Sequence, residues 1–227
     1  YCDTSEDEHP DNLRFLRDVE KWLGVEVKFL KSTKYKNVDD VIKQTNYIVG
    51  PHYAPCTKML KTKLREEYQR ETDIHVFGYT NDEQKRATRF EMNNSHMEID
   101  WILIEENISK SHCYAHIDKA GITQNQMYLD GYPNANCLGC VKASNLAYWG
   151  KIKQQYPEIY EKRAKQERMV GATINKDQRG GKRIPIYLDE MTEDDYARGR
   201  PLKEFKFDCG VLCSIPTQEE RDLFDAN

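Results

Sequence analysis

The sequence of 227 residues predicts an α/β fold, in which helices flank a mostly parallel sheet and cysteines hold a small C-terminal subdomain. The first observation is that a strand-like segment, a helical pattern and a second strand-like segment follow one another within residues 1–30. Consecutive parallel strands need such a crossover. The second is that short apolar runs alternate with helical patterns up to residue 121. The third is two close cysteine pairs, Cys137 with Cys140 and Cys209 with Cys213.

The composition is that of an ordinary globular protein, with 38% hydrophobic and 32% charged residues. The net charge of −4 gives no global basic field and argues against nucleic acid as a partner. No apolar run reaches the roughly 20 residues that cross a bilayer, so no membrane partner is expected. Seven unevenly spread cysteines fit a reducing compartment, which favours a cytoplasmic location.

The first 50 residues predict two strands and two helices. Residues 1–5 are expected to end a strand and enter a polar loop. Leu13, Phe15 and Leu16 begin a helical apolar pattern, and Gly24 is expected to end that helix. Residues 25–30 alternate as a strand does, and residues 37–46 have the spacing of a short helix.

The segment from residue 50 to 121 predicts further alternation of helices and strands. A loop at 50–55 leads into a basic helix, and Ser109 or Ser111 is expected to cap the last helix, which ends at Gly121. The predicted elements are a helix at 56–71, a strand at 74–79, a helix at 82–92, a strand at 101–104 and a helix at 109–121.

The C-terminal part predicts helices around the first cysteine pair, which itself lies on a tight turn rich in Asn and Gly. Its expected elements are helices at 141–155 and 157–171, a flexible link at 179–182, an extended piece at 184–188 and a loop at 190–200. The expected organisation is therefore a nucleotide-binding α/β domain at 1–130, a helical cysteine subdomain at 131–215 and a tail at 216–227.

Two groups of basic residues are candidate anion ligands. Lys58 and Lys61 lie three apart on the basic helix, and in an α-helix that spacing shares a face. Arg86 follows the strand at 74–79, and a guanidinium can hold a phosphate through two hydrogen bonds. The alternative for each of them is an ordinary solvated charged face.

The four paired cysteines are candidate metal ligands. Four thiolates in two close pairs, Cys137 with Cys140 and Cys209 with Cys213, can hold zinc or a 4Fe-4S cluster, and the spacing does not choose between them. The alternative is that two of them are core thiols. Cys56 is placed at a helix N-terminus, where a thiolate is favoured, although a buried or incidental thiol is the commoner outcome.

Three segments resemble the phosphoadenosine phosphosulfate (PAPS) reductase family of the PP-loop, or adenine nucleotide alpha-hydrolase, superfamily, whose fold is HUP-like. The order and spacing of the segments carry the resemblance, and the cysteine segment is similar to phage and bacterial members. The segments are Asp3-Thr4-Ser5 with Glu8-His9-Pro10, Gly78-Tyr79-Thr80-Asn81-Asp82-Glu83 with Arg86 and Arg89, and Cys137-Leu138-Gly139-Cys140-Val141-Lys142 with Trp149 and Pro157.

The resemblance implies a protein that binds an adenine nucleotide, ATP or PAPS, at the carboxyl edge of its sheet. It would reduce a sulfonucleotide with a thiol reductant as partner, or act as an ATP-dependent sulfurtransferase. Cys209 resembles the nucleophile that attacks the sulfur of the sulfonucleotide, although Cys213 beside it suits metal ligation better. The implied nucleotide-binding residues are Asp3, Thr4, Ser5, Lys58, Lys61, Gly78, Glu83 and Arg86.

The chain also departs from the family's pattern. The Ser-Gly-Gly-Lys-Asp-Ser phosphate loop is absent, and it is expected roughly 30 residues ahead of Asp3, the length of one strand–helix–strand unit. Ser5 and Thr80 stand where the family has Gly and Arg. One alternative is therefore a catalytically inactive member that serves as a binding or structural partner. A weaker alternative is a nucleic-acid-modifying sulfurtransferase that uses residues 151–165.

Overall fold

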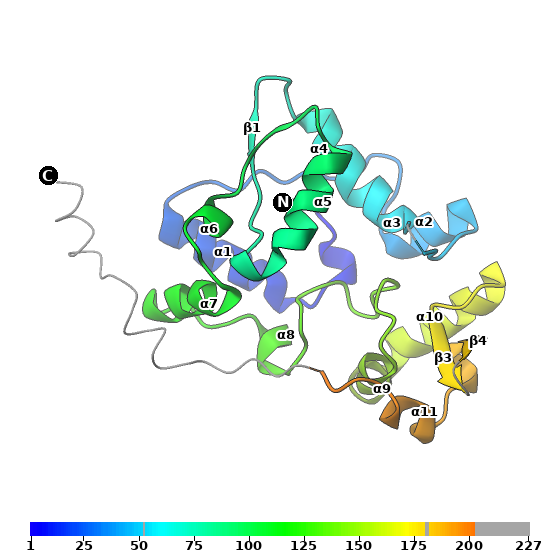
Figure 1. Cartoon of the computed structure of the whole chain (residues 1–227). Helices are drawn as coiled ribbons and strands as arrows, with labels where there is room; N and C mark the ends of the chain where they lie inside the picture. Colours follow the sequence, from blue (N-terminus) through cyan, green and yellow to red (C-terminus); the bar gives the residue numbers. More distant parts are fainter. Residues whose placement is uncertain (52, 180–181, 203–227) are drawn as a thin grey trace, which may run out of the picture. The chain divides into compact units, whose positions relative to one another are not determined.

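The computed structural model describes residues 1–51, 53–179 and 182–202, which form two compact units (Figure 1). The larger unit is described over residues 1–68 and 125–202, and the smaller over residues 69–124. The smaller unit begins at Gln69, inside the segment that the sequence predicts as one domain at 1–130, and the chain re-enters the larger unit at Asn125. Cys209, Cys213 and the expected tail lie outside the described residues.

The larger unit is mainly helical over its described residues. One antiparallel strand pair, β3 with β4, follows its longest helix. Its elements are η1 (Ser5–Asp7), α1 (Asp11–Leu23), α2 (Val38–Thr45), α3 (Pro55–Thr57), the π-helix η2 (Lys58–Thr62), α4 (Lys63–Tyr68), α8 (Gln126–Leu129), α9 (Leu146–Gln155), α10 (Pro157–Val170), β3 (Asn175–Arg179), β4 (Lys182–Ile186), η4 (Leu188–Glu190) and α11 (Glu193–Ala197).

The smaller unit alternates short strands with helices. Its elements are β1 (Ile74–Val76), η3 (Asn81–Glu83), α5 (Gln84–Asn93), β2 (Glu98–Asp100), α6 (Ile102–Glu105) and α7 (Lys110–Lys119). The two strands pair in parallel, with His75 opposite Ile99. Phe77, Phe90 and Trp101 pack around the strand ends, and the Phe77 and Phe90 ring centroids are 4.7 Å apart.

Parallel pairing confirms the predicted α/β class in its coarse form. In the smaller unit β1 pairs in parallel with β2, and in the larger unit Cys2 and Leu30 form a parallel bridge. The segment expected as a strand at 25–30 is therefore paired only near its end. Helix α1 lies between Cys2 and Leu30 in the sequence and supplies the crossover that the sequence predicts.

Local capping chemistry confirms several predicted helix ends. Gly24 ends α1 in the left-handed region with a φ of 65°. Asn37 starts α2 by accepting a hydrogen bond from the Asp40 amide, and Asn46 ends the helix at a φ of 48°. Ser109 caps α7 in the same way through the His112 amide, so of the two candidate serines Ser109 is the cap.

The predicted strand at 101–104 is wrong, because β2 ends at Asp100 and Ile102–Glu105 forms one helical turn. A short apolar run does not distinguish a strand from a helix by its periodicity. The loop predicted at 190–200 is also wrong. It contains α11, which starts with a capping box of Thr192 and Asp195.

Two further boundaries differ from the prediction. The helix expected from 141 starts at Leu146, because the Asn145 side chain accepts a hydrogen bond from the Ala147 amide and sets the first turn there. The expected link at 179–182 lies inside a β-hairpin in which Arg179 is paired with Lys182.

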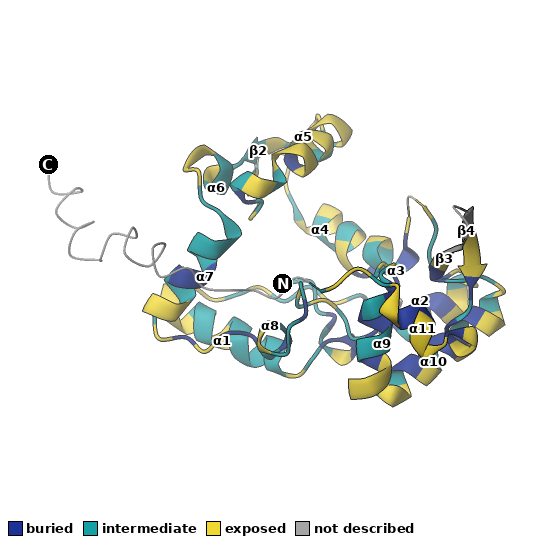
Figure 2. Cartoon of the chain, turned by 60° about the horizontal axis from the view of Figure 1, so that its bottom comes forward, coloured by how far each residue is buried: buried dark blue, intermediate teal, exposed yellow. Residues whose placement is uncertain are grey.

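The main hydrophobic core lies in the larger unit, where α2, α9, α10 and the strand pair bring buried residues together (Figure 2). Val41, Ile42, Trp149, Ile152 and Leu188 are each 0% exposed. Complete burial of such side chains stabilises a fold by roughly 1.5–3 kcal/mol each. This core fixes the cysteine turn, since Val141 and Cys137 pack against it.

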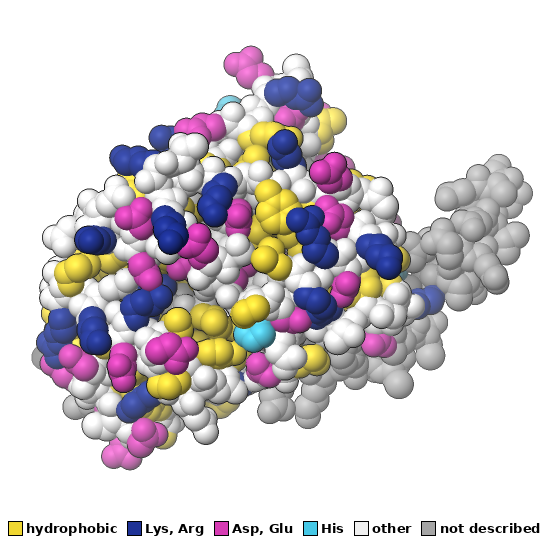
Figure 3. All heavy atoms as spheres, turned by 180° about the vertical axis from the view of Figure 1, so that it is seen from behind, with side chains coloured by type: hydrophobic (Ala, Val, Ile, Leu, Met, Phe, Trp, Pro, Cys, Tyr) yellow, Lys and Arg dark blue, Asp and Glu magenta, His cyan; other side chains and the backbone are white. Residues whose placement is uncertain are grey.

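The surface carries both signs of charge. On the face drawn in Figure 3, basic and acidic side chains are interspersed around small apolar areas. In the part of the chain that the structure describes, no helix has the length and apolar character that crossing a membrane requires.

Candidate functional site

The loop of Asp3, Thr4 and Ser5 lies where the first strand-like segment ends. Leu30 anchors that segment on both sides, donating to the Tyr1 carbonyl at 2.8 Å and accepting from the Asp3 amide at 2.7 Å. In open α/β sheets, ligands bind beyond the carboxyl ends of parallel strands. The predicted adenosine loop therefore follows a segment that is paired in parallel at one bridge.

Asp3 organises this loop through a short local turn. Its Oδ1 accepts hydrogen bonds from the Ser5 amide at 3.1 Å and the Ser5 hydroxyl at 2.6 Å. Lys31 approaches Oδ2 at 3.9 Å. Burial alone would raise the pKa of Asp3, but the hydrogen bonds from Ser5 together with Lys31 lower it. The carboxylate is thus held ionised, and it fixes the orientation of Ser5.

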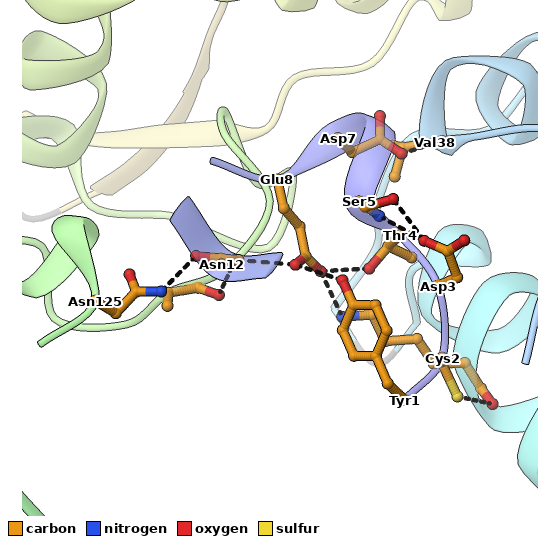
Figure 4. A network of polar contacts seen from close by, with 12 residues as sticks. Tyr1, Cys2, Asp3, Thr4, Ser5, Asp7, Glu8, Asn12, Val38 and Asn125 are labelled. Carbon is orange, nitrogen blue, oxygen red and sulfur yellow. Dashed lines mark hydrogen bonds and ion pairs between the residues drawn. The ribbon is translucent and has the colours of Figure 1, made fainter. Parts of the chain in front are cut away.

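Glu8 is the centre of the polar network beside this loop (Figure 4). Its carboxylate is buried and accepts hydrogen bonds from the Thr4 hydroxyl, from the Tyr1 hydroxyl at 2.7 Å and from Asn12 Nδ2 at 2.9 Å. Lys61 Nζ lies 3.9 Å from Glu8 Oε1. Because buried charges are retained when they are paired and hydrogen-bonded, Glu8 can hold a cation or an ammonium group in this position.

Asp7 joins the loop to the cysteine turn. Its side chain accepts a hydrogen bond from the Val38 amide at 2.8 Å, at the start of α2. Its carbonyl accepts from the Leu138 amide at 2.8 Å, between the two cysteines. Burial raises the pKa of the Asp7 carboxyl. One residue therefore links the candidate nucleotide loop to the candidate metal-ligating turn.

The turn itself depends on Gly139. This residue has a φ of +60°, and a Cβ there would lie 2.7 Å from Ile159 Cγ2. Arg163, which is 1% exposed, donates from Nε to the Gly139 carbonyl at 2.9 Å. The Cys140 amide donates to the Tyr148 hydroxyl at 3.1 Å. The backbone of the turn is therefore fixed by groups from both α9 and α10.

Burial governs two thiols of this region, those of Cys137 and Cys56. Burial raises the pKa of the Cys137 thiol to about 12, Lys61 opposes the rise, and Cys140 and Glu8 add to it. Burial also raises the pKa of Cys56, and Cys140 adds to that rise. Cys56, Cys137 and Cys140 thus interact electrostatically. Burial therefore favours the neutral thiols of Cys137 and Cys56.

The metal prediction can be compared with the structure only in part. Two of its four ligands, Cys209 and Cys213, lie outside the described residues, as does the candidate nucleophile, which is the same Cys209. Over the residues that are described, no group of three or more His, Cys, Asp or Glu side chains has an arrangement that could hold a metal ion. Cys137 and Cys140 are the described residues that would supply half of such a site.

The two predicted lysines point to different places. Lys61 lies near Glu8, whereas Lys58 Nζ lies 6.0 Å from the ring centroid of Tyr53. Both belong to η2, a π-helix, in which each residue turns through a smaller angle than in an α-helix. The prediction that they share one face is therefore wrong, because it assumed α-helical spacing.

The remaining predicted residues, Gly78, Glu83 and Arg86, belong to the smaller unit. Thr80 and Glu83 form a capping box at the start of η3. Arg86 is paired with Glu83 at 2.6 Å, and its guanidinium lies 4.5 Å from the ring centroid of Tyr79. The Arg86 side chain is 66% exposed, so its outer face is open to an anion.

Sequence reasoning missed several residues of this site. Glu8 carries a recognisable signal, because it belongs to the Glu-His-Pro segment that resembles the family. The sequence marks Cys56 only as a thiol at a helix start, and the effect of Cys140 on its pKa depends on the tertiary fold. No sequence signal marks Arg163, because it lies in the middle of a charged helix.

Comparison with protein-family models, with curated proteins and with solved structures finds no match to this chain. The class of site is therefore defined by its own residues. It is a polar loop at the end of a parallel-paired segment, joined to a turn that carries two cysteines.

Proposed function

We propose that the chain is a PAPS reductase-like protein of the PP-loop superfamily that binds an adenine nucleotide or a sulfonucleotide. The observation that carries this proposal is the hydrogen bond of 2.8 Å between the Leu138 amide and the Asp7 carbonyl. It joins the Asp3-Thr4-Ser5 loop to the cysteine turn, and both segments resemble that family. A nucleotide-binding loop beside a turn that carries two cysteines is suited to sulfur chemistry on a nucleotide.

The HUP-like form of the fold belongs to the same proposal. It is supported by parallel pairing at two places, Cys2 with Leu30 and β1 with β2. Each pairing lies just ahead of a segment that resembles the family, Asp3-Thr4-Ser5 in one unit and Gly78–Glu83 in the other. A cysteine-held C-terminal subdomain is proposed with it.

In this proposal Asp3, Thr4 and Ser5 hold the adenosine, and Lys61 holds an anionic group beside Glu8. In the smaller unit, Arg86 is proposed as an anion ligand in its own right, for which its exposed guanidinium is suited. The reaction is reduction of a sulfonucleotide by a thiol, or ATP-dependent transfer of sulfur. The competing proposal is a catalytically inactive protein that serves as a binding or structural partner. It would bind the nucleotide through the same loop but would catalyse no sulfur transfer or reduction.

We also propose that Cys137 and Cys140 hold zinc or a 4Fe-4S cluster together with Cys209 and Cys213. Support comes from the buried, fixed turn and from the raised pKa of Cys137, because a bound cation would stabilise the thiolate that burial disfavours. Bound there, the metal would tie the C-terminal segment to the turn. If it is absent, Cys209 is the candidate nucleophile.

The test measures binding of ATP and of PAPS to the chain by isothermal titration calorimetry. Asp3→Ala should weaken binding by about 1–3 kcal/mol, because it frees Ser5 and removes a charge-assisted contact. Arg86→Ala should weaken it by a similar amount. Asp18→Ala on α1 and Lys85→Ala on α5 are the matched controls and should leave the affinity unchanged.

Two results would contradict the proposal. Failure of both nucleotides to bind would remove the nucleotide site and with it the family assignment. Binding that Asp3→Ala leaves unchanged would place the nucleotide elsewhere in the protein. Tight binding with neither sulfite release in the presence of a thiol reductant nor sulfur transfer in the presence of ATP would favour the inactive partner.

A further inference from the structure

A second feature of the larger unit is a cavity of about 1390 Å³ on the side of η2 that carries Lys58. Its lining comes from the loop before α3, from η2, from the turn after Cys140, from the start of β3 and from the residues after α11. Pockets for small molecules measure roughly 300–1,000 Å³. This cavity is therefore large enough for an extended ligand.

The charge of the lining is strongly positive. Among the described residues it includes five cations and one carboxylate, Glu66. Arg65 lies 3.9 Å from Glu66, and Arg198 is paired with Asp195. The cations are Lys58, Lys142, Lys176, Arg198 and Arg200. Although the chain has a net charge of −4, several positive charges converge here from separate segments, which produces a local field that attracts anions.

The scaffold fixes part of this arrangement. Asn145 donates from Nδ2 to the Arg200 carbonyl at 2.8 Å. Gly199 packs directly against the backbone of Ala147, leaving no room for a side chain. Lys142 follows Val141, which is 2% exposed. The backbones that present Arg200 and Lys142 are thus held by the core rather than by flexible loops.

An aromatic surface adjoins the cations. Tyr53 lines the cavity and is 40% exposed, and its ring centroid lies 5.9 Å from that of Tyr47, which is 41% exposed. The Tyr47 hydroxyl lies over Gly50, where any Cβ would collide with it. Exposed aromatic rings beside a basic groove are the combination that binds unpaired bases and their phosphates.

We propose that this cavity binds single-stranded nucleic acid, with successive phosphates on Lys142, Lys58 and Arg200 and a base stacked on Tyr53. Its size and the spread of its cations favour several phosphates over one mononucleotide. The tyrosine pair favours bases over an acidic peptide, which has no ring to stack. This site is separate from the Asp3-Thr4-Ser5 loop and does not depend on the nucleotide function proposed above.

The test is fluorescence anisotropy with a fluorescein-labelled oligo(dT) and an RNA oligo(U), titrated over a range of salt concentrations. Lys142→Ala and Arg200→Ala should each weaken binding about three- to tenfold and flatten the slope of log K against log salt by about 0.7. Tyr53→Ala should weaken binding about tenfold with little change in slope, because stacking releases no counterions. Circular dichroism checks that each variant is folded.

Matched controls are Lys21→Ala, an exposed lysine of α1, and Tyr68→Ala, an exposed tyrosine at the end of α4. Both should bind as the unaltered chain does. Equal losses in controls and cavity variants would overturn the proposal. Complete displacement of the oligonucleotide by polyglutamate or by ATP at matched charge would also overturn it. So would the absence of oligonucleotide binding at about 50 mM salt. Binding of ATP to the Asp3 loop should be unchanged in Lys142→Ala, which separates the two sites.

Discussion

The guanidinium of Arg163 reaches across from α10 to donate to the carbonyl of Gly139 at 2.9 Å. The same side chain pairs with Asp39 at 2.5 Å and is 1% exposed. A buried arginine therefore holds both the cysteine turn and the first turn of α2. This arrangement makes the shape of the turn dependent on a charge that lies outside the cysteine motif.

Arg163→Met should lower the free energy of unfolding by about 2–4 kcal/mol, because it leaves the Gly139 carbonyl and part of Asp39 without their buried partner. Urea denaturation monitored by tryptophan fluorescence would measure the change. Lys162→Met is the matched control, since Lys162 pairs with the same Asp39 at 2.7 Å from a side chain that is 40% exposed. Lys162→Met should lower the free energy of unfolding by less than about 1 kcal/mol. Equal effects would contradict the role assigned to Arg163.

Gly139→Ala should destabilise the turn for two reasons, its positive φ and the close approach of Ile159. We expect a loss of roughly 2–4 kcal/mol in the free energy of unfolding. Gly171→Ala separates the two causes, because Gly171 has a φ of +72° and a Cβ added there would have no neighbouring atom within 4 Å. Gly171→Ala should lower the free energy of unfolding by only about 1–2 kcal/mol. A smaller effect at Gly139 than at Gly171 would show that the turn can relax.

Glu167 predicts a pH dependence of stability. It is 0% exposed, and its carboxylate accepts hydrogen bonds from the Ile174 amide at 2.5 Å and the Leu188 amide at 2.6 Å. Burial nevertheless raises the pKa of Glu167 from 4.5 to about 7. Between these values the folded chain binds more protons than the unfolded chain, so stability falls as pH rises.

The expected loss between pH 4.5 and about 7 is at most roughly 3 kcal/mol, with no further change from this group above that range. Urea midpoints across this interval would measure it. Glu167→Gln should be less stable at low pH but should show a flatter profile. Asp7, whose pKa burial also raises, contributes a slope of the same sign, so Asp7→Asn serves as the comparison. An unchanged slope in Glu167→Gln would exclude Glu167 as the source.

The proposed metal site makes a prediction about sets of cysteines. Cys137→Ser and Cys209→Ser should each lose the bound metal, and the double variant should be little worse than either one, because the ligands act as a unit. Metal analysis for zinc and the visible absorption of anaerobically purified protein would identify the loss. Cys113→Ser, in the smaller unit, is the control and should keep the metal. Full metal content in Cys209→Ser would show that the two cysteine pairs do not share one metal site.

Local patterns predicted most helix ends, because their signals are contained in a few residues. Gly24, Asn37 and Ser109 each act through hydrogen bonds or backbone angles within one turn. The sequence of α10 shows the opposite case. Arg163 and Glu167 belong to a run of charges that is typical of a solvated face, yet both are buried. Their partners come from α2, the cysteine turn and residues 174–188, which no local pattern connects to them.

The candidate site shows the same division. The Asp3 and Ser5 turn is local and follows from residue types, whereas the hydrogen bond from Leu138 to Asp7 joins segments that are distant in the chain. That Lys58 and Lys61 point to different places depends on the type of helix that carries them. Sequence alone could not supply it, because basic residues at this spacing are equally compatible with an α-helix.

The π-helical turn at Lys58–Thr62 also has an evolutionary meaning. A single π turn is what an α-helix becomes when it accommodates one extra residue. Because the π turn absorbs the extra residue, deletion of one codon within it, for example that of Met59, would restore regular winding and leave the helical turns on either side nearly in register. One such deletion would therefore change the angle between the Lys58 and Lys61 side chains in a single mutational step, without changing any charged residue.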